Sequence, residues 1–323
     1  MILRYNAFIP KRRVIIMKKV KAFACVLAVA MIAGMFAGCS KTSKISTDSF
    51  AKACSKLKLE EFEVDGDAPD ADDYEGGIYV VADKDAVEDH AEGINSSLKQ
   101  MGLDFDADDI ESLAFAAKCT GYDDAKDAIK DPEDLADVKI DGAAAFQVTF
   151  KKEKTAMKVM KAIEKYMDDA NLKEKDFTAN EYYSGKNEAY FRFHIDIKKF
   201  AKLILANDDI ADMLETYGDQ MDVDFEDLLG KLSGDVAISV EVNGANVFIL
   251  VGGALNQKAD TLNKFASAYG ASNPAKVAMN EKICEKAIDG VTDYLAKAKS
   301  AAEQVKKHNE EVDKVNEEID AAL

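Results

Sequence analysis

The chain lacks tryptophan, and only four prolines and three histidines occur among its 323 residues. Aromatic residues make up 8%, which disfavours a glycan-binding site built on aromatic platforms. His90, His194 and His308 have no metal-ligand spacing with one another or with a cysteine. There is no nucleophile elbow, and Gly252-Gly253 alone does not make a phosphate-binding loop. The sequence therefore predicts no catalytic site, no resident metal and no cofactor.

Positive charge is also scarce. The 60 acidic residues outnumber the 42 basic ones and give a formal net charge of −18. Residues 1–38 hold seven basic residues and no acidic one, so the rest of the chain has 35 basic against 60 acidic residues and a net charge of −25. Such a charge repels phosphate backbones and anionic lipid surfaces. We expect no nucleic-acid partner, and any membrane attachment must come from something other than surface charge.

The N-terminal segment has the order of an export signal. From Met17, basic residues at 18, 19 and 21 precede an apolar run over 22–36, which Ala37, Gly38 and Cys39 follow. The run is shorter than the roughly 20 apolar residues of a spanning helix. Residues 36–39, Phe-Ala-Gly-Cys, resemble the lipobox of bacterial lipoproteins, whose commonest form is Leu-Ala-Gly-Cys.

This resemblance implies a signal peptide over 17–38, cleavage between Gly38 and Cys39, and acyl chains such as palmitate on Cys39. Two acyl chains suffice for stable anchoring, since each buried CH₂ contributes about 0.8 kcal/mol. The expected partner is membrane lipid through Cys39, on the extracytoplasmic face of the cell membrane. An uncleaved signal anchor is the alternative. Residues 1–16 are expected to be an extension upstream of a start at Met17, or else to carry a twin-arginine export motif at 11–16.

The remaining chain predicts a short tether and an α+β domain. Residues 39–47 comprise the lipidated cysteine and eight mostly polar residues that span at most about 28 Å. The domain is expected over 48–272, as one unit or as two related subdomains. Alternation predicts strands at 78–82, 144–150 and 190–197, and a hairpin at 236–251 that turns at Asn243-Gly244. Helices are expected at 48–57, 84–101, 153–169, 198–206 and 256–269. This order favours helices packed on one face of a mostly antiparallel sheet.

Residues 273–323 are predicted to form one long helix with Pro274 in its first turn. Two seams repeat every seven residues, as in a coiled coil: 284, 291, 298, 305, 312 and 319, and 288, 295, 302, 309, 316 and 323. Asn309 and Asn316 lie on the second seam, where asparagine can fix the register of a partner helix. We expect either self-association or docking of a helical partner along 298–323, or a monomer whose last turns project into solvent.

Two acidic runs have the alternate spacing that opens an EF-hand loop: Asp104, Asp106 and Asp108, and Asp222, Asp224 and Glu226. Both lack the glycine at position six and the glutamate at position twelve that calcium binding in such a loop requires. A solvated acidic surface is the favoured interpretation. Loose binding of divalent ions by the acidic loop at 65–73 is the alternative.

Three cysteines remain beyond Cys39, and each lies on an apolar face: Cys54, Cys119 and Cys284. Buried thiols are therefore expected, with a Cys54–Cys119 disulfide as the alternative that an exported protein allows. His194 lies beside Arg192 on the polar face of its predicted strand, where we expect a solvated histidine rather than a general base.

These observations predict a membrane-anchored, extracytoplasmic lipoprotein that binds or scaffolds. The first alternative is the solute-binding lipoprotein of a transporter, which requires two α/β lobes with parallel sheets. The second is an extracytoplasmic enzyme, which the absence of a catalytic set disfavours.

Overall fold

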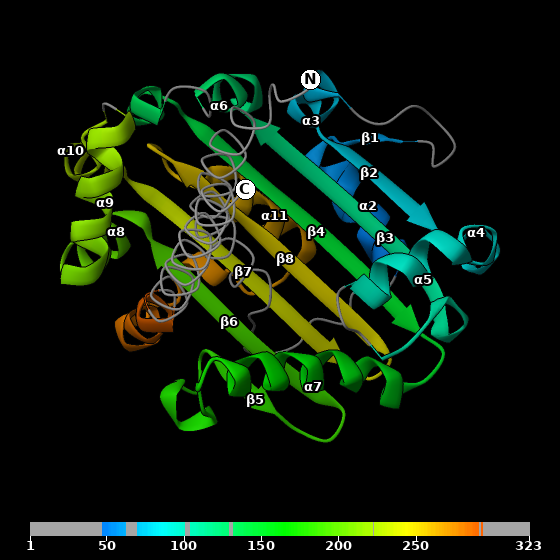
Figure 1. The fold of residues 1–323 in the computed structure, drawn as a ribbon. Coiled ribbons are helices and arrows are strands. Elements are labelled where there is room, and N and C mark those ends of the chain that lie inside the picture. Colours follow the sequence, from blue (N-terminus) through cyan, green and yellow to red (C-terminus); the bar gives the residue numbers. More distant parts are fainter. Residues whose placement is uncertain are drawn as a thin grey trace, which may run out of the picture.

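A computed structural model describes residues 47–62, 70–100, 104–128, 132–221, 223–290 and 292. Within them one sheet of eight strands runs in the order β1-β2-β3-β4-β8-β7-β6-β5 (Figure 1). The strands are β1 Glu60–Glu61, β2 Ile78–Ala82, β3 Ile110–Thr120, β4 Ile140–Phe150, β5 Tyr182–Ser184, β6 Glu188–Asp196, β7 Gly234–Asn243 and β8 Asn246–Leu255. All neighbours are antiparallel except β1 and β2, so the predicted α+β class with a mostly antiparallel sheet is confirmed.

The strand order is mirrored about the centre of the sheet. Strands β1 to β4 form one half, β5 to β8 form the other, and β4 pairs with β8 between them. Both halves of the chain thus contribute to a single continuous sheet. The predicted hairpin turns at Gly244, whose φ of 61° is the left-handed conformation that glycine adopts readily.

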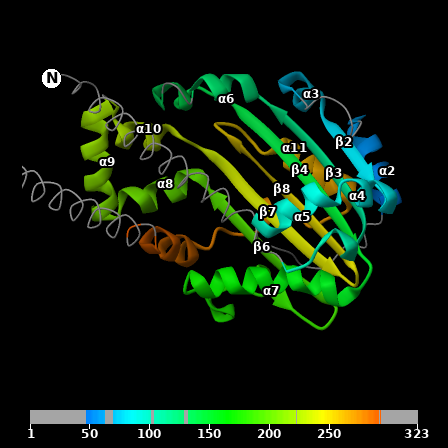
Figure 2. The same cartoon turned by 45° about the vertical axis from the view of Figure 1, so that its right-hand side comes forward.

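Helices cover both faces of the sheet, which corrects the expectation of helices on one face only. The helices are α2 Thr47–Leu57, α3 Ala71–Gly76, α4 Lys84–Asp89, α5 Ala91–Gln100, α6 Tyr122–Ala128, α7 Glu153–Asp169, α8 Ile197–Leu205, α9 Asp208–Met221, α10 Phe225–Lys231 and α11 Asp260–Tyr269. Helices α4, α5 and α7 lie on the face that Figure 1 presents, here called the front face, and α2 and α11 lie behind the sheet (Figures 1 and 2). On the back of β8, Phe248 and Leu250 are buried; on its front, Val247 is buried whereas Ile249 and Val251 are half-buried.

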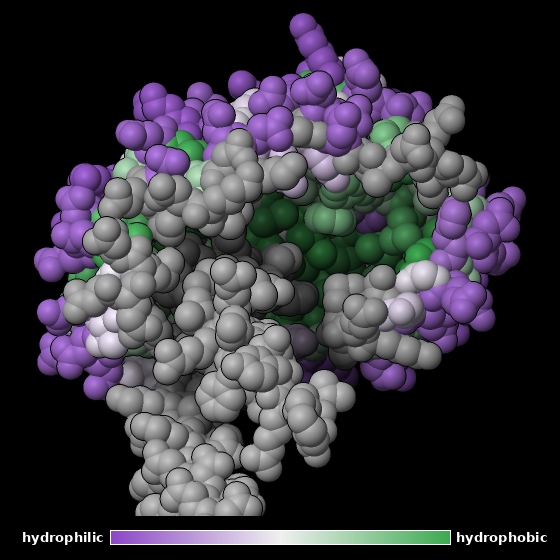
Figure 3. Space-filling model, turned by 45° about the horizontal axis from the view of Figure 1, so that its top comes forward, coloured by the Kyte–Doolittle hydropathy of each residue, from purple (hydrophilic) through white to green (hydrophobic). Residues whose placement is uncertain are grey.

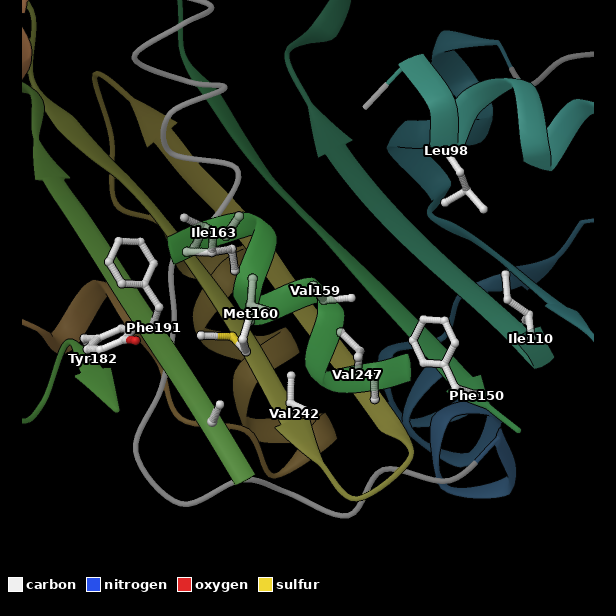
Figure 4. Close-up of a cluster of buried hydrophobic side chains, with 14 of the residues drawn as sticks. Leu98, Ile110, Phe150, Val159, Met160, Ile163, Tyr182, Phe191, Val242 and Val247 are labelled. Atoms are coloured by element: carbon white, nitrogen blue, oxygen red, sulfur yellow. The ribbon is translucent and has the colours of Figure 1, made fainter. Parts of the chain in front are cut away.

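Helix α7 begins and ends where the sequence predicts. Its buried residues recur at helical spacing and form one apolar stripe: Ala156, Val159, Met160, Ile163 and Met167. This stripe packs on the lower half of the front face, against residues of β6, β7 and β8 such as Phe191, Val242 and Val247 (Figure 4). Burial of about five such side chains is what fixes the helix on the sheet.

The back layer is held by aromatic packing. Phe50 of α2 is fully buried, and its ring centroid lies 4.8 Å from that of Tyr269 in α11. Phe248 of β8 and Phe265 of α11 also contact Tyr269. The two back helices and the centre of the sheet therefore share one apolar cluster.

The long helix expected from Pro274 onward is not supported. Pro274–Lys276 is a short 3₁₀ helix (η4), and Val277 ends it in an extended conformation. A separate helix occupies 281–290, where the Asn280 side chain accepts a hydrogen bond from the Ile283 backbone amide at 3.3 Å. Residues 293–323, with the seam predicted to bind a partner helix, lie outside the described residues.

Two other predicted helices have different bounds. The helix expected over 84–101 is divided at His90 into α4 and α5. The helix expected from 256 begins at Asp260, because residues 256–259 follow the last strand as a loop and Asn256 has a positive φ of 53°. None of the helices among the described residues combines the length and apolar character needed to span a bilayer.

Candidate functional site

The front face of the sheet is apolar over its centre, and strand register determines which side chains form it. Phe115 of β3 pairs with Phe146 of β4, which pairs with Ile249 of β8, which pairs with Val240 of β7. Because partners across a ladder point to the same side, these four side chains form one row on the front face.

The next rows toward α6 contain smaller side chains. Two residues further along each strand the row is Ala117, Ala144, Val251 and Ile238, and the row after it is Cys119, Gly142, Gly253 and Val236. Alanine and glycine fill less space than the phenylalanine and isoleucine beside them. The face is therefore concave, and Figure 3 shows it as a hollow lined by hydrophobic residues with a hydrophilic rim.

Phe146 lies at the centre of this concave face and is 40% exposed. Among the described residues only three other large hydrophobic side chains are as exposed, and all three are tyrosines, which carry a polar hydroxyl. The Phe146 ring stacks at a tilt on Phe115, with ring centroids 4.8 Å apart. An exposed phenylalanine that stacks on a half-buried one in a concave apolar surface is typical of a ligand-binding face.

The concave face continues into a cavity beneath α5. The cavity has a volume of about 630 Å³, within the ~300–1,000 Å³ common for small-molecule sites. Leu113 and Val148 line it, and they also lie on the front face. Leu98 points down from α5 toward Ile110 and Phe150 at the end of the strands (Figure 4).

The mouth of the cavity differs from its interior. The polar side chains that line it come from the end of α4 and the start of α5: Asp89, His90 and Glu92. All three are exposed. An apolar interior with a few polar groups at its entrance has the chemistry of a site for an elongated apolar molecule.

The residues predicted to carry the lipid, Gly38 and Cys39, lie outside the described residues. The first described residue is Thr47, at the start of α2. Thr47, expected as the last residue of the tether, belongs to this helix.

His194 is not the solvated histidine that its strand position predicts. Its side chain is only 11% exposed; Nδ1 lies 2.8 Å from the Val277 carbonyl oxygen and Nε2 lies 2.8 Å from Asp235 Oδ1. Both neighbours accept hydrogen bonds, so a neutral ring donates to one of them and a protonated ring to both. With both nitrogens occupied, His194 joins the sheet to the segment after η4 and has no nitrogen available for a substrate.

Each acidic run contributes one residue that caps a short helix. Asp106 accepts a hydrogen bond from the Asp108 amide at 3.1 Å, and Asp224 accepts one from the Asp227 amide at 2.9 Å. Asp70 and Asp73 form a capping box at α3. Within the described part of the chain, no three His, Cys, Asp or Glu side chains are grouped so as to hold a metal ion.

The three described cysteines are free thiols, so the alternative Cys54–Cys119 disulfide is not formed. The Cys54 thiol lies 3.2 Å from the Tyr269 hydroxyl, on the back of the sheet. Cys119 belongs to the front-face row described above, whereas Cys54 of α2 is in the back cluster, so the sheet separates the two sulfurs. Burial raises the pKa of Cys54 to about 11 and that of Cys284 to about 12, which disfavours the reactive thiolate.

A second cavity, of about 860 Å³, lies between the loop 174–181 and the segment 273–281. Two of the carboxylates that line it accept hydrogen bonds from nearby groups. Asp176 Oδ1 accepts from Lys282 Nζ at 2.6 Å, and Glu181 Oε2 accepts from the Thr178 amide at 2.6 Å and from Asn280 Nδ2 at 3.1 Å. We interpret this polar cluster as the attachment of the C-terminal segment to the domain.

Comparisons with protein-family models, with curated proteins and with solved structures find no match for this chain. Its function must therefore be argued from the residues themselves.

The sequence interpretation missed the concave face because it missed β3. Residues 110–120 follow an acidic run, and seven of the eleven are alanine or polar residues, which obscures the alternating pattern. The signal present in the sequence was the spacing of Leu113, Phe115 and Ala117, which places them on one side of a strand.

Proposed function

We propose that this protein is a lipid-anchored, extracytoplasmic binding protein, and that the concave front face of the sheet with its cavity holds an elongated apolar small molecule. The observation that carries the proposal is Phe146, a fully apolar side chain that is 40% exposed at the centre of a concave surface. Water contact with such a surface is unfavourable by about 25 cal/mol per Å², so an apolar ligand that covers it gains that free energy.

The proposed anchor supports this choice of ligand. Acyl chains on Cys39 and a tether of at most about 28 Å would keep the domain close to the bilayer, where apolar molecules are concentrated. The scaffolding alternative is less favoured, since a concave site with a cavity suits a small molecule better than a flat protein surface.

The transporter alternative is less favoured as well. A solute-binding lipoprotein of that type needs two lobes with parallel sheets, whereas the described strands join one mostly antiparallel sheet. The enzyme alternative has no supporting constellation among the described residues, because His194 is engaged on both sides and no metal-binding group is present there.

The anchor is tested by Cys39→Ala. Intact-mass analysis of membrane fractions should find the acylated chain beginning at Cys39 for the wild-type protein and an unlipidated, uncleaved chain for the variant. A mature wild-type protein that begins at another residue, or that carries no acyl chain, would contradict this part of the proposal.

The binding face is tested with Nile red, an uncharged dye that fluoresces in apolar sites, on the chain from residue 40 to 323, which contains every described residue. Phe146→Asp should abolish the dye signal. Tyr183→Asp is the matched control, since Tyr183 is 46% exposed on the edge strand β5 and should leave the signal unchanged. Equal dye binding by both variants would refute the proposed site.

A further inference from the structure

We infer that the cavity beneath α5 receives the alkyl chain of an amphiphile whose head group is uncharged or cationic, and that Asp89 and Glu92 at the mouth reject anionic head groups. This inference rests on the proposed function and specifies the class of ligand for the same site.

The interior of the cavity accounts for the alkyl chain. Its walls are aliphatic and aromatic side chains from four directions: Leu98 of α5, Ile110 and Leu113 of β3, Phe150 of β4 and Val159 of α7. In Figure 4 Leu98, Ile110, Phe150 and Val159 surround the space between α5 and α7. Among the described residues no charged side chain lines this inner part, so a charged group placed there would lose its hydration without compensation from them.

The mouth accounts for the preference between head groups. A chain that enters the cavity leaves its head group beside the end of α4 and the start of α5, where Asp89 and Glu92 are exposed carboxylates. A carboxylate or phosphate head would meet two like charges there, whereas an ammonium head would be attracted and a glycerol head would be unaffected. The net charge of −25 after residue 38 acts in the same direction.

The continuity of the site explains how a long chain is accommodated. Leu113 and Val148 border both the cavity and the concave face, so a ligand longer than the cavity can extend along the sheet over Phe146. The cavity and the concave face thus bind different parts of the same ligand.

The experiment compares three amphiphiles with the same chain length, each below its critical micelle concentration: monododecanoylglycerol, dodecyltrimethylammonium and dodecanoate. Binding to residues 40–323 is measured by titration calorimetry at low and at physiological salt. The uncharged and cationic compounds should bind at least about tenfold more tightly than dodecanoate at low salt, and the gap should narrow as salt screens the mouth.

The double variant Asp89→Lys, Glu92→Lys should reverse the order of dodecanoate and dodecyltrimethylammonium, and it alters only exposed residues. Glu215→Lys, an exposed acidic residue of α9 far from the cavity, is the matched charge control and should leave the order unchanged. Leu98→Asp should weaken all three compounds; its far-ultraviolet circular dichroism shows whether the fold is retained.

The inference about the head group would be overturned by equal affinity for the three compounds, or by an order of affinities that the double variant leaves unchanged. In either case, Nile red binding that depends on Phe146 would still support the proposed function. If the head-group preference and the dependence of Nile red binding on Phe146 are both absent, both proposals are overturned.

Discussion

Lys286, in the last described helix, places its Nζ 2.7 Å from Oδ2 of Asp176, whose side chain is 2% exposed. Lys282 donates to the other carboxylate oxygen, and the Lys173 amide donates to Oδ2 at 2.9 Å. These bonds hold the pKa of Asp176 far below its usual range. A single carboxylate therefore joins the C-terminal segment to the loop that precedes β5.

We predict that this attachment weakens in acid. A carboxyl group whose pKa is lowered on folding contributes stability above its unfolded pKa of about 3.9, and that contribution is lost as pH falls from there toward the folded pKa. The protection of residues 277–290 from hydrogen exchange, relative to the exchange rate of an unstructured chain at the same pH, should therefore fall below about pH 4.

Asp176→Asn should accelerate exchange of the same segment at pH 7, and the difference from wild type should shrink as the pH falls below 4. Asp209→Asn, an exposed change on α9, serves as the control and should leave exchange unaltered at every pH. A pH-independent difference between wild type and Asp176→Asn would contradict the assigned role of the carboxylate charge.

Gly252 is predicted to tolerate no side chain. A Cβ there would lie 2.5 Å from the Gly142 carbonyl oxygen and 2.9 Å from the Cβ of Ala143. Since backbone would have to move, Gly252→Ala should lower the free energy of unfolding by about 1–3 kcal/mol in urea titrations. Gly230→Ala is the comparison: nothing lies within 4 Å of its added Cβ, and alanine in helix α10 should raise stability by about 0.5–1 kcal/mol. Equal effects of the two changes would show that the strands are less closely packed there.

Thiol reactivity should separate the three described cysteines. Cys54 and Cys284 are buried and their pKa values are raised to about 11 and about 12, so iodoacetamide should modify them only after unfolding. Cys119 is half-buried and should react first, although burial raises its pKa as well. Peptide mass spectrometry at pH 8 measures the order in which the three thiols are modified. Modification of Cys54 before Cys119, or a Cys54–Cys119 disulfide in protein purified from membranes, would be incompatible with the described packing.

The C-terminal residues remain the subject of a prediction made from sequence alone. If residues 298–323 associate through their seam, the chain 40–323 should sediment as a dimer or larger species, and the chain 40–297 should sediment as a monomer. A monomer for both chains at high concentration would exclude self-association and leave only a different partner.

The elements that could be predicted are those whose pattern is local. Helix α7 shows an apolar stripe at helical spacing, and the β7–β8 hairpin has alternation and an Asn-Gly turn, so both were placed correctly. The helix expected from Pro274 was wrong because local signals for helix compete with tertiary contacts there: Val277 stays extended while its carbonyl oxygen meets His194, in a strand far away in sequence.

The candidate site could not be predicted for a related reason. The row Phe115, Phe146, Ile249 and Val240 comes from four strands, and only the pairing of β4 with β8 brings its two halves together. The sequence of β4 likewise gives no indication that Phe146 is exposed. Buried residues alternate with less buried ones along this strand, and Phe146 is the most exposed of them. Which apolar residue is left uncovered depends on where α5 and α7 end, which is a property of the packed molecule.

The mirrored strand order has a consequence for how the chain reaches its folded state. One whole side of β4 bonds to β8, which is synthesised long after it, so a nascent chain that has completed only the first four strands presents a row of unsatisfied backbone donors and acceptors. Such an edge can pair with another chain. A chain cut between the two halves should therefore leave an aggregation-prone fragment rather than a smaller stable domain.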